Sequence, residues 1–122
     1  MALGHLRDSG AAPRHYTTDE LRVELVHKRL VDSVRAEPLL RSGDGERITG
    51  HDRDHSTAFA ATLRCYLRRF GDVGAASADL HIHQNTLRQR LRRAQELFAL
   101  DLGDPAQRLV LELELHAAAA DR

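Results

Sequence analysis

The sequence has little of several features that define common classes of small protein. It has 122 residues with one cysteine and no tryptophan, and aromatic residues make up 4% of it. A single cysteine excludes a disulfide framework and a cysteine-rich zinc module, and it fits a reducing compartment. No apolar run approaches the roughly 20 residues that span a bilayer, and the beginning, MALGHLRDSG, lacks the apolar centre of a signal peptide. We therefore expect one small cytoplasmic domain without a membrane segment.

The chain also lacks net charge, but its charges are unevenly distributed. The 18 Lys and Arg residues balance 18 Asp and Glu residues. Residues 56–95 carry seven arginines against two aspartates, or +5, whereas residues 1–55 (nine against ten) sum to −1 and residues 96–122 (two against six) to −4. A local basic block is typical of nucleic-acid binding, although a solvated helix face gives the same run of charge.

The first half of the chain is expected to hold one helix. Residues 1–16 lack periodicity and are predicted to form a disordered tail. Residues 17–20, TTDE, have the spacing of a capping box, which predicts a helix from Thr17 to about Glu37, before Pro38. Residues 41–54 are glycine-rich and polar, which predicts a loop or linker.

The second half is expected to hold the remaining helices of an all-α fold with about five helices in total. Apolar residues at helical spacing predict helices over residues 59–70, over Ala75–Leu80 and after His83. The last segment, LVLELELHAAAA, is ambiguous because its leucines alternate as in a strand. Asp104 and Pro105 before it are typical of a helix start and favour a helix that is apolar on two sides.

The sharpest motif is a helix, a three-residue turn and a second helix within Val73–Leu91. Ala76 and Ser77 are small where the second helix would cross the first. Apolar residues flank the turn and continue into the second helix, which fixes the two helices at one angle and lets the second project into a major groove. These residues are Leu80, Ile82, Leu87 and Leu91.

This motif, LHIHQNTLRQRLRR, resembles the C-terminal helix-turn-helix of the PucR family, bacterial regulators of purine and sugar-diacid catabolism. TLRCYL before it and ELFALDLGDPAQRLVLELEL after it resemble the flanks of that domain, so the resemblance covers about residues 55–116. It implies a helical bundle with a Fis-like helix-turn-helix, in which residues 55–118 bind DNA. It also implies, through VRAEPLL, that residues 17–40 are the remnant of an upstream regulatory domain whose sensory part is missing.

The sequence departs from the family pattern at three positions of the motif. Gly74, Gln84 and Gln89 stand where the family usually has serine, arginine and a large residue such as tyrosine. The two glutamines keep DNA binding chemically possible but change what would be read. They also support an alternative, in which the chain is a helical interaction or dimerisation module that no longer binds DNA.

The candidate DNA-binding residues lie on the second motif helix, opposite its apolar stripe. We expect Gln84, Asn85, Arg88 and Gln89 to reach base edges, because Arg pairs with guanine and Gln or Asn with adenine. Arg92 and Arg93 lie further along and are expected to contact phosphates. Asn85 and Thr86 fall in the first turn, where helix capping competes with DNA contact.

These observations predict a sequence-specific transcriptional regulator that binds double-stranded DNA as a homodimer, with Leu111, Leu115 and the second apolar side of residues 21–34 as the interface. The sequence offers no nucleophile with a base and an orienting group, so we do not expect an enzyme or a cofactor. His81 and His83 have the spacing of a metal-binding pair, but no further ligand stands at supporting spacing. We expect a polar turn there and no metal.

Overall fold

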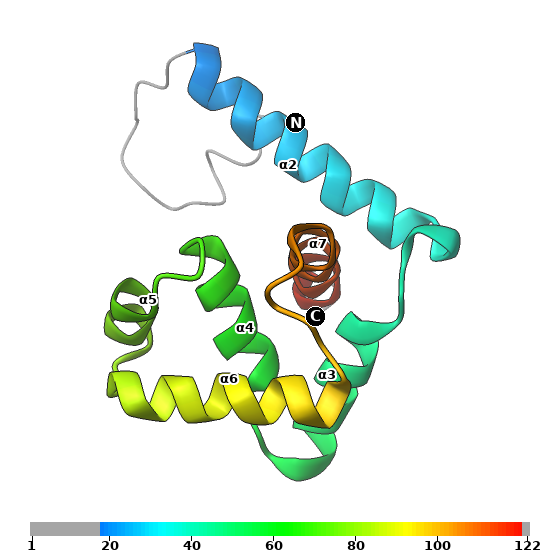
Figure 1. Cartoon of the computed structure of the whole chain (residues 1–122). Helices are drawn as coiled ribbons and strands as arrows, with labels where there is room; N and C mark the ends of the chain where they lie inside the picture. The colour runs from blue at the N-terminus through cyan, green and yellow to red at the C-terminus, as the bar shows by residue number, and fades with distance from the viewer. Residues whose placement is uncertain (1–17, 121–122) are drawn as a thin grey trace.

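The computed structural model describes residues 18–120, and within them the chain forms six α-helices, one 3-10 turn and no strand (Figure 1). The all-α prediction is confirmed, including a helix over the last leucine-rich segment. No helix of this part is long and apolar enough to cross a membrane. The tail predicted over residues 1–16 and the cap predicted at Thr17 lie outside the described residues. The elements are α2 (Thr18–Ala36), η1 (Pro38–Leu40), α3 (Asp44–His55), α4 (Phe59–Arg68), α5 (Val73–Leu80), α6 (Gln84–Phe98) and α7 (Pro105–Ala120).

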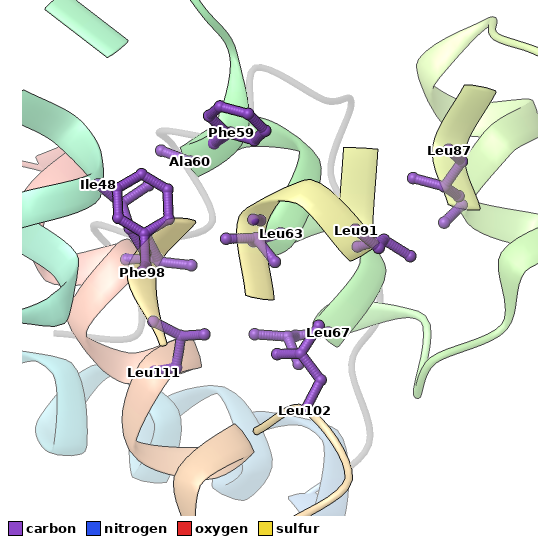
Figure 2. Close-up of a cluster of buried hydrophobic side chains, with 13 residues drawn as sticks. Ile48, Phe59, Ala60, Leu63, Leu67, Leu87, Leu91, Phe98, Leu102 and Leu111 are labelled. Carbon is purple, nitrogen blue, oxygen red and sulfur yellow. The ribbon is translucent and has the colours of Figure 1, made fainter. Parts of the chain in front are cut away.

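Helix α7 occupies the centre of the bundle and contacts α2, α3 and α4 (Figure 1). Three of its alternating leucines, Leu111, Leu113 and Leu115, are buried, and they lie on two sides of the helix, whereas Leu109 is exposed. Leu111 and Leu115 enter the main apolar cluster, which α3, α4 and α6 also build (Figure 2). Leu113 enters a second cluster, in which Val31 and Val34 of α2 are also buried. The period of two in the sequence therefore reflects a helix covered from two directions, not a strand.

One part of the predicted dimer interface is wrong for the same reason. Leu111 and Leu115 are 4% and 1% exposed, since they pack in the main cluster of the same chain. The sequence showed that this helix has more apolar residues than one buried stripe needs. It did not show that two clusters of the same chain bury them.

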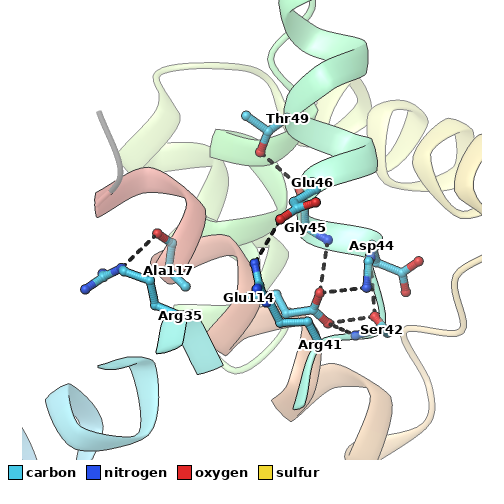
Figure 3. A network of polar contacts seen from close by, with 10 residues as sticks. Arg35, Arg41, Ser42, Asp44, Gly45, Glu46, Thr49, Glu114 and Ala117 are labelled. Atoms are coloured by element: carbon cyan, nitrogen blue, oxygen red, sulfur yellow. Dashed lines mark hydrogen bonds and ion pairs between the residues drawn. The ribbon is translucent and has the colours of Figure 1, made fainter. Parts of the chain in front are cut away.

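The prediction of a loop over residues 41–54 is also wrong, because α3 fills most of that segment. Ile48 is the single apolar residue with a large side chain in α3, and it is fully buried in the main cluster. The carboxylate of Glu114 on α7 stabilises the start of the helix (Figure 3). It accepts hydrogen bonds from the Ser42 hydroxyl at 2.6 Å, from the backbone N–H of Ser42 at 3.2 Å, of Gly43 at 3.1 Å and of Gly45 at 3.4 Å. A buried carboxylate at a helix N-terminus satisfies free N–H groups and interacts favourably with the helix dipole.

Helix α3 in turn holds the ends of two other helices. Asp52 accepts hydrogen bonds from the backbone N–H groups of Phe59 at 2.9 Å and Ala60 at 2.8 Å, and so caps the start of α4. The Arg47 guanidinium donates to the Phe98 carbonyl at 2.9 Å at the end of α6, and it lies 5.9 Å from the centre of the Phe98 ring. Helix α3 is therefore part of the bundle that positions α6.

Candidate nucleic-acid interface

Helices α5 and α6 form the predicted helix-turn-helix, and each begins at a side-chain cap. Asp72 accepts a hydrogen bond from the backbone N–H of Ala75 at 3.0 Å and so starts α5. His83 accepts one from the N–H of Asn85 at 3.0 Å through Nδ1 and so starts α6. Between them, His81 ends α5 in the left-handed conformation, with φ of 56°. The expectation of a polar turn with His83 near the helix start is confirmed.

The angle between the two helices is fixed by the residues that the motif predicted. Ala76 and Ser77 are buried in α5, so their small side chains leave room for close packing. Leu87 and Leu91 are buried on α6, and the stripe continues through Ala94 and Phe98 into the main cluster. Leu80 and Ile82 pack against that cluster on either side of the turn. Helix α6 is therefore held along its whole inner side, which is the rigidity that groove recognition needs.

The outer side of α6 carries the predicted DNA-binding residues on one continuous polar surface. Helix α6 runs across the lower part of the molecule in Figure 1, beside α4 and α5. Thr86 differs from the rest because it is half-buried. The remaining predicted residues are exposed: Gln84, Asn85, Arg88, Gln89, Arg92 and Arg93.

The first turn of α6 leaves its side-chain amides available. His83 caps α6, so the Asn85 side chain does not act as the helix cap. Of the two roles that the sequence left open for Asn85, capping is therefore excluded. Arg88 instead donates to Asn85 at 3.3 Å and to Gln84 at 3.4 Å. Both contacts are long and exposed, so Arg88 can exchange them for another acceptor at small cost.

Arg92 and Arg93 are exposed cations on the same helix. Neither forms an ion pair with another residue in the part of the chain that the structure describes. The two arginines line a shallow depression together with Thr86, Gln89, Arg90 and Glu96, and Phe59 forms its apolar wall. Arg90, the third exposed arginine of this depression, has no ion pair among the described residues either. The surface of α6 is therefore strongly positive.

The basic block of residues 56–95 does not form one surface. Arg69 makes a two-point contact with Asp79 of α5, at 2.6 and 2.9 Å, so its charge is neutralised within the fold. The hydrogen bond from Arg69 lowers the pKa of the Asp79 carboxyl. The charges of Arg64 and Arg68 act on His116 of α7. Burial of His116, followed by the charges of His27, Arg68 and Arg64, lowers its pKa to about 4. The arginines of this block are therefore distributed over more than one part of the fold, and four of them lie on α6.

Two residues that help to position α6, Arg47 and Glu114, were not predicted from the sequence. Arg47 and Glu114 act on α6 and α3 over 51 and up to 72 residues of chain, respectively. Such distant polar contacts leave no local pattern, since a lone arginine or glutamate looks like an ordinary surface residue. The acidic residues at the start of α3, Asp44 and Glu46, were the available signal for that helix.

Comparison with known proteins supports the motif. Residues 59–117 match the family model of the PucR C-terminal helix-turn-helix domain. In Bacillus subtilis, the DNA-binding transcriptional activator AdeR is 32% identical over 69 residues, and the proline-responsive transcriptional activator PutR is 38% identical over 68 residues. An uncharacterised protein from the pkwA 5′ region of Thermomonospora curvata is 36% identical over 62 residues. No solved structure matches.

These matches cover a part of each protein. The aligned residues are 57% and 56% of this chain for AdeR and PutR but 16% of each activator, and they are 34% of the Thermomonospora protein. The matched region begins with α4 and ends within α7, so it contains the whole helix-turn-helix and its predicted DNA-binding residues. Residues 59–117 therefore belong to the family of PucR C-terminal helix-turn-helix domains.

Proposed function

We propose that this protein is a sequence-specific regulator of transcription that inserts α6 into the major groove of double-stranded DNA. The observation that carries the proposal is the outer side of α6, which is exposed, polar and positively charged while its inner side is locked into the core. Residues 55–118 supply the DNA-binding unit, and α2 belongs to what remains of a regulatory part upstream.

The exposed residues of α6 divide into two roles along the helix. Gln84, Asn85, Arg88 and Gln89 lie in its first two turns, the part of a recognition helix that enters the groove. Their amide and guanidinium groups suit paired hydrogen bonds to adenine and guanine. Arg92 and Arg93 lie a turn later, where the backbone passes, and suit phosphate oxygens. Thr86, half-buried at the edge of this surface, contributes a hydroxyl to the backbone contact.

We further propose that the protein binds as a homodimer through an apolar patch, defined as Val23, Val26 and Leu30 of α2 with Leu109 of α7. These side chains are 66%, 51%, 44% and 56% exposed, and together they line one apolar hollow. One helix-turn-helix reads few base pairs, so a second copy at a half-site about 34 Å away supplies the missing affinity. Helix α2 packs on α7 and η1 and not on α6, so pairing through the patch leaves both copies of α6 free (Figure 1).

Selection of bound duplexes from a random library by the full chain tests the DNA-binding proposal. We expect a conserved sequence to be enriched, and fluorescence anisotropy on it to show affinity that falls with salt. With about three to five phosphates contacted per subunit, the log–log slope is expected to be about −3 to −5 per subunit. A flat salt dependence and no enriched sequence would instead support the alternative, an interaction module that no longer binds DNA; the apolar patch is the observation that favours it.

Sedimentation at micromolar concentration tests the homodimer. Val26→Asp is expected to convert a dimer into a monomer, because a carboxylate would be buried in the patch. Leu39→Asp is the matched control: Leu39 is 99% exposed on η1, outside the patch, and its replacement should leave the dimer intact. A wild-type chain that remains monomeric with and without its selected DNA would contradict the proposal.

A further inference from the structure

Three potential metal ligands converge between α2 and α7, outside the DNA-binding surface. His27 comes from α2, and Glu112 and His116 lie one turn apart on α7. One ligand atom from each side chain lies within 4.8 Å of the other two, and all three residues are half-buried. The two imidazole rings meet edge to face with their centres 5.0 Å apart. Helix packing thus gathers three side chains that are separated by as many as 89 residues of chain.

Two ring nitrogens of this cluster have no protein partner within the described residues. The Nε2 atoms of His27 and His116 are both buried, and neither has a hydrogen-bond partner in that part of the chain. The Glu112 carboxylate is 4.0 Å from His116 Nε2, which is too far for a hydrogen bond. Buried polar atoms without partners cost stability, and native proteins rarely leave two side by side. The arrangement calls for a further group that contacts both rings.

We propose that His27, Glu112 and His116 bind one Zn²⁺ ion that ties α2 to α7. Two imidazoles and one carboxylate are an established zinc ligand set, with a fourth position left for water or another ligand. Nitrogen-rich sites of this kind favour Zn²⁺ over Mg²⁺, which prefers oxygen ligands. A neutral imidazole has a ring nitrogen with a lone pair to donate to the ion.

The geometry permits tetrahedral coordination with small side-chain movements. Zinc–ligand bonds of about 2.1 Å place neighbouring ligand atoms roughly 3.4 Å apart. Ligand atoms that start within 4.8 Å therefore close by about 1.4 Å or less, which rotation of the side chains achieves without moving either helix. Arg64 and Arg68 oppose a cation here, because their charges act on His116. The Glu112 carboxylate, as a direct ligand at about 2.1 Å, offsets that repulsion.

The ion would strengthen a weakly held contact. Helix α2 packs on α7 through a cluster of four buried residues, and α7 is the one α-helix that it contacts among those in residues 18–120. His27 lies one turn before Val31 of that cluster, so the metal would add a fixed point at the next turn of α2 toward its N-terminus. Metal binding would thereby stabilise the position of α2, which lies outside the family-matched residues 59–117.

Titration of Zn²⁺ into the full, chelator-stripped chain by calorimetry tests the proposal. We expect one ion per chain with a Kd in the micromolar range or below. At a free Zn²⁺ concentration of 100 times Kd, the Tm should rise by roughly 10 °C, while Mg²⁺ should have no effect. Co²⁺ should bind at the same stoichiometry and give the visible absorption of a tetrahedral site.

Variants assign the binding to the cluster. His27→Ala and Glu112→Gln are each expected to weaken Zn²⁺ binding at least tenfold and to reduce the Tm shift. Circular dichroism checks that they fold, and Glu112→Gln keeps the size of the side chain. The matched control is His55→Ala, which removes a histidine that stacks on His51 at 4.2 Å and so offers a competing histidine pair on α3. Absence of Zn²⁺ binding below millimolar concentration, wild-type affinity in both cluster variants, or loss of binding in His55→Ala would each overturn the proposal.

Discussion

Replacing Gly45 by alanine is expected to destabilise the fold, although alanine is normally the better residue in a helix. Gly45 lies in the first turn of α3, where the helix approaches α7 closely. A Cβ atom at this position would lie 2.9 Å from Cβ of Glu114 and 3.1 Å from its backbone C and O atoms. Because two of these three atoms belong to the backbone of α7, the neighbour cannot yield by a side-chain rotation, and α3 must move away.

The size of the effect follows from what that movement disturbs. Normal carbon–carbon contacts are about 3.5–4.0 Å, so α3 must retreat by roughly 0.6–1 Å. Overpacking of this kind costs about 1–3 kcal/mol. The retreat also lengthens the hydrogen bonds that the Glu114 carboxylate accepts at the start of α3, and bonds to a charged group contribute about 1.5–3 kcal/mol each. After a helix-propensity gain of up to about 1 kcal/mol, we expect a net loss of about 2–4 kcal/mol.

Gly50 in the same helix provides the matched control. A Cβ atom there meets only the end of the Arg53 side chain at 3.5 Å, which is an ordinary contact. Gly50→Ala should therefore stabilise the protein by about 0.5–1 kcal/mol. Urea unfolding followed by far-ultraviolet circular dichroism measures both variants against the wild type. If Gly45→Ala proves as stable as Gly50→Ala, α3 does not lie against α7 as described, and the reasoning fails.

Three other contacts give independent predictions. Asp52→Ala should lower the free energy of unfolding by about 1–2 kcal/mol, because two backbone N–H groups at the start of α4 lose their acceptor. Asp54 is exposed, so Asp54→Ala should have little effect. Equal stabilities of the two variants in urea unfolding would contradict the cap. Burial, followed by the charge of Asp79, raises the pKa of the Cys65 thiol. Alkylation by iodoacetamide should therefore be slow at neutral pH, and its rate should keep rising with pH throughout the range below the raised pKa. A rate that levels off below pH 8 would refute this. Arg69 lowers the pKa of the Asp79 carboxyl. The pair therefore stabilises the fold above the unfolded pKa of about 3.9, and this contribution is lost as the pH falls through the lower folded pKa. An NMR titration should show a higher Asp79 midpoint in Arg69→Ala, and an unchanged midpoint would exclude the pair.

The helix-turn-helix could be predicted from the sequence because its determinants are local. Leu87 and Leu91 follow the spacing of a helix with one buried side, and the small residue Ala76 stands where the two helices cross. The outer face of α6 follows from the same periodicity, since the residues opposite a buried stripe are exposed. Which of those residues touches which part of DNA stays a prediction, because helical spacing fixes a face and not a docking angle.

The features that the sequence missed depend on contacts between distant residues. Helix α3 has one large apolar residue, Ile48, and its start is completed by Glu114, so no periodic pattern announces it. The spacing of Glu112 and His116 on one helix was visible, but its partner His27 lies on a helix whose packing direction the sequence did not specify. Local patterns therefore predicted the candidate recognition helix α6. Helix α3, which supports it, and the cluster of His27, Glu112 and His116 depend on tertiary packing and could not be predicted in this way.

In the proposed complex, the first two turns of α6 read base edges while its later arginines contact the DNA backbone. Arg88 and Arg93 separate these roles, because both are exposed and neither forms an ion pair within the described residues. Neither substitution touches Leu87 or Leu91, so thermal stability should barely change in Arg88→Ala or Arg93→Ala. Any loss of DNA affinity then reports contact with DNA and not unfolding.

Competition binding of the two variants on the selected duplex and on a scrambled duplex is the most direct measurement. Arg88→Ala should cost about 1–3 kcal/mol on the selected duplex and much less on the scrambled one. Arg93→Ala should weaken both alike and reduce the magnitude of the salt slope by about one unit. Equal losses of affinity on both duplexes for Arg88→Ala would show that Arg88 contacts phosphate and that α6 lies in the groove in a different rotation about its axis. Wild-type affinity in both variants would contradict the account, since α6 would then not face DNA.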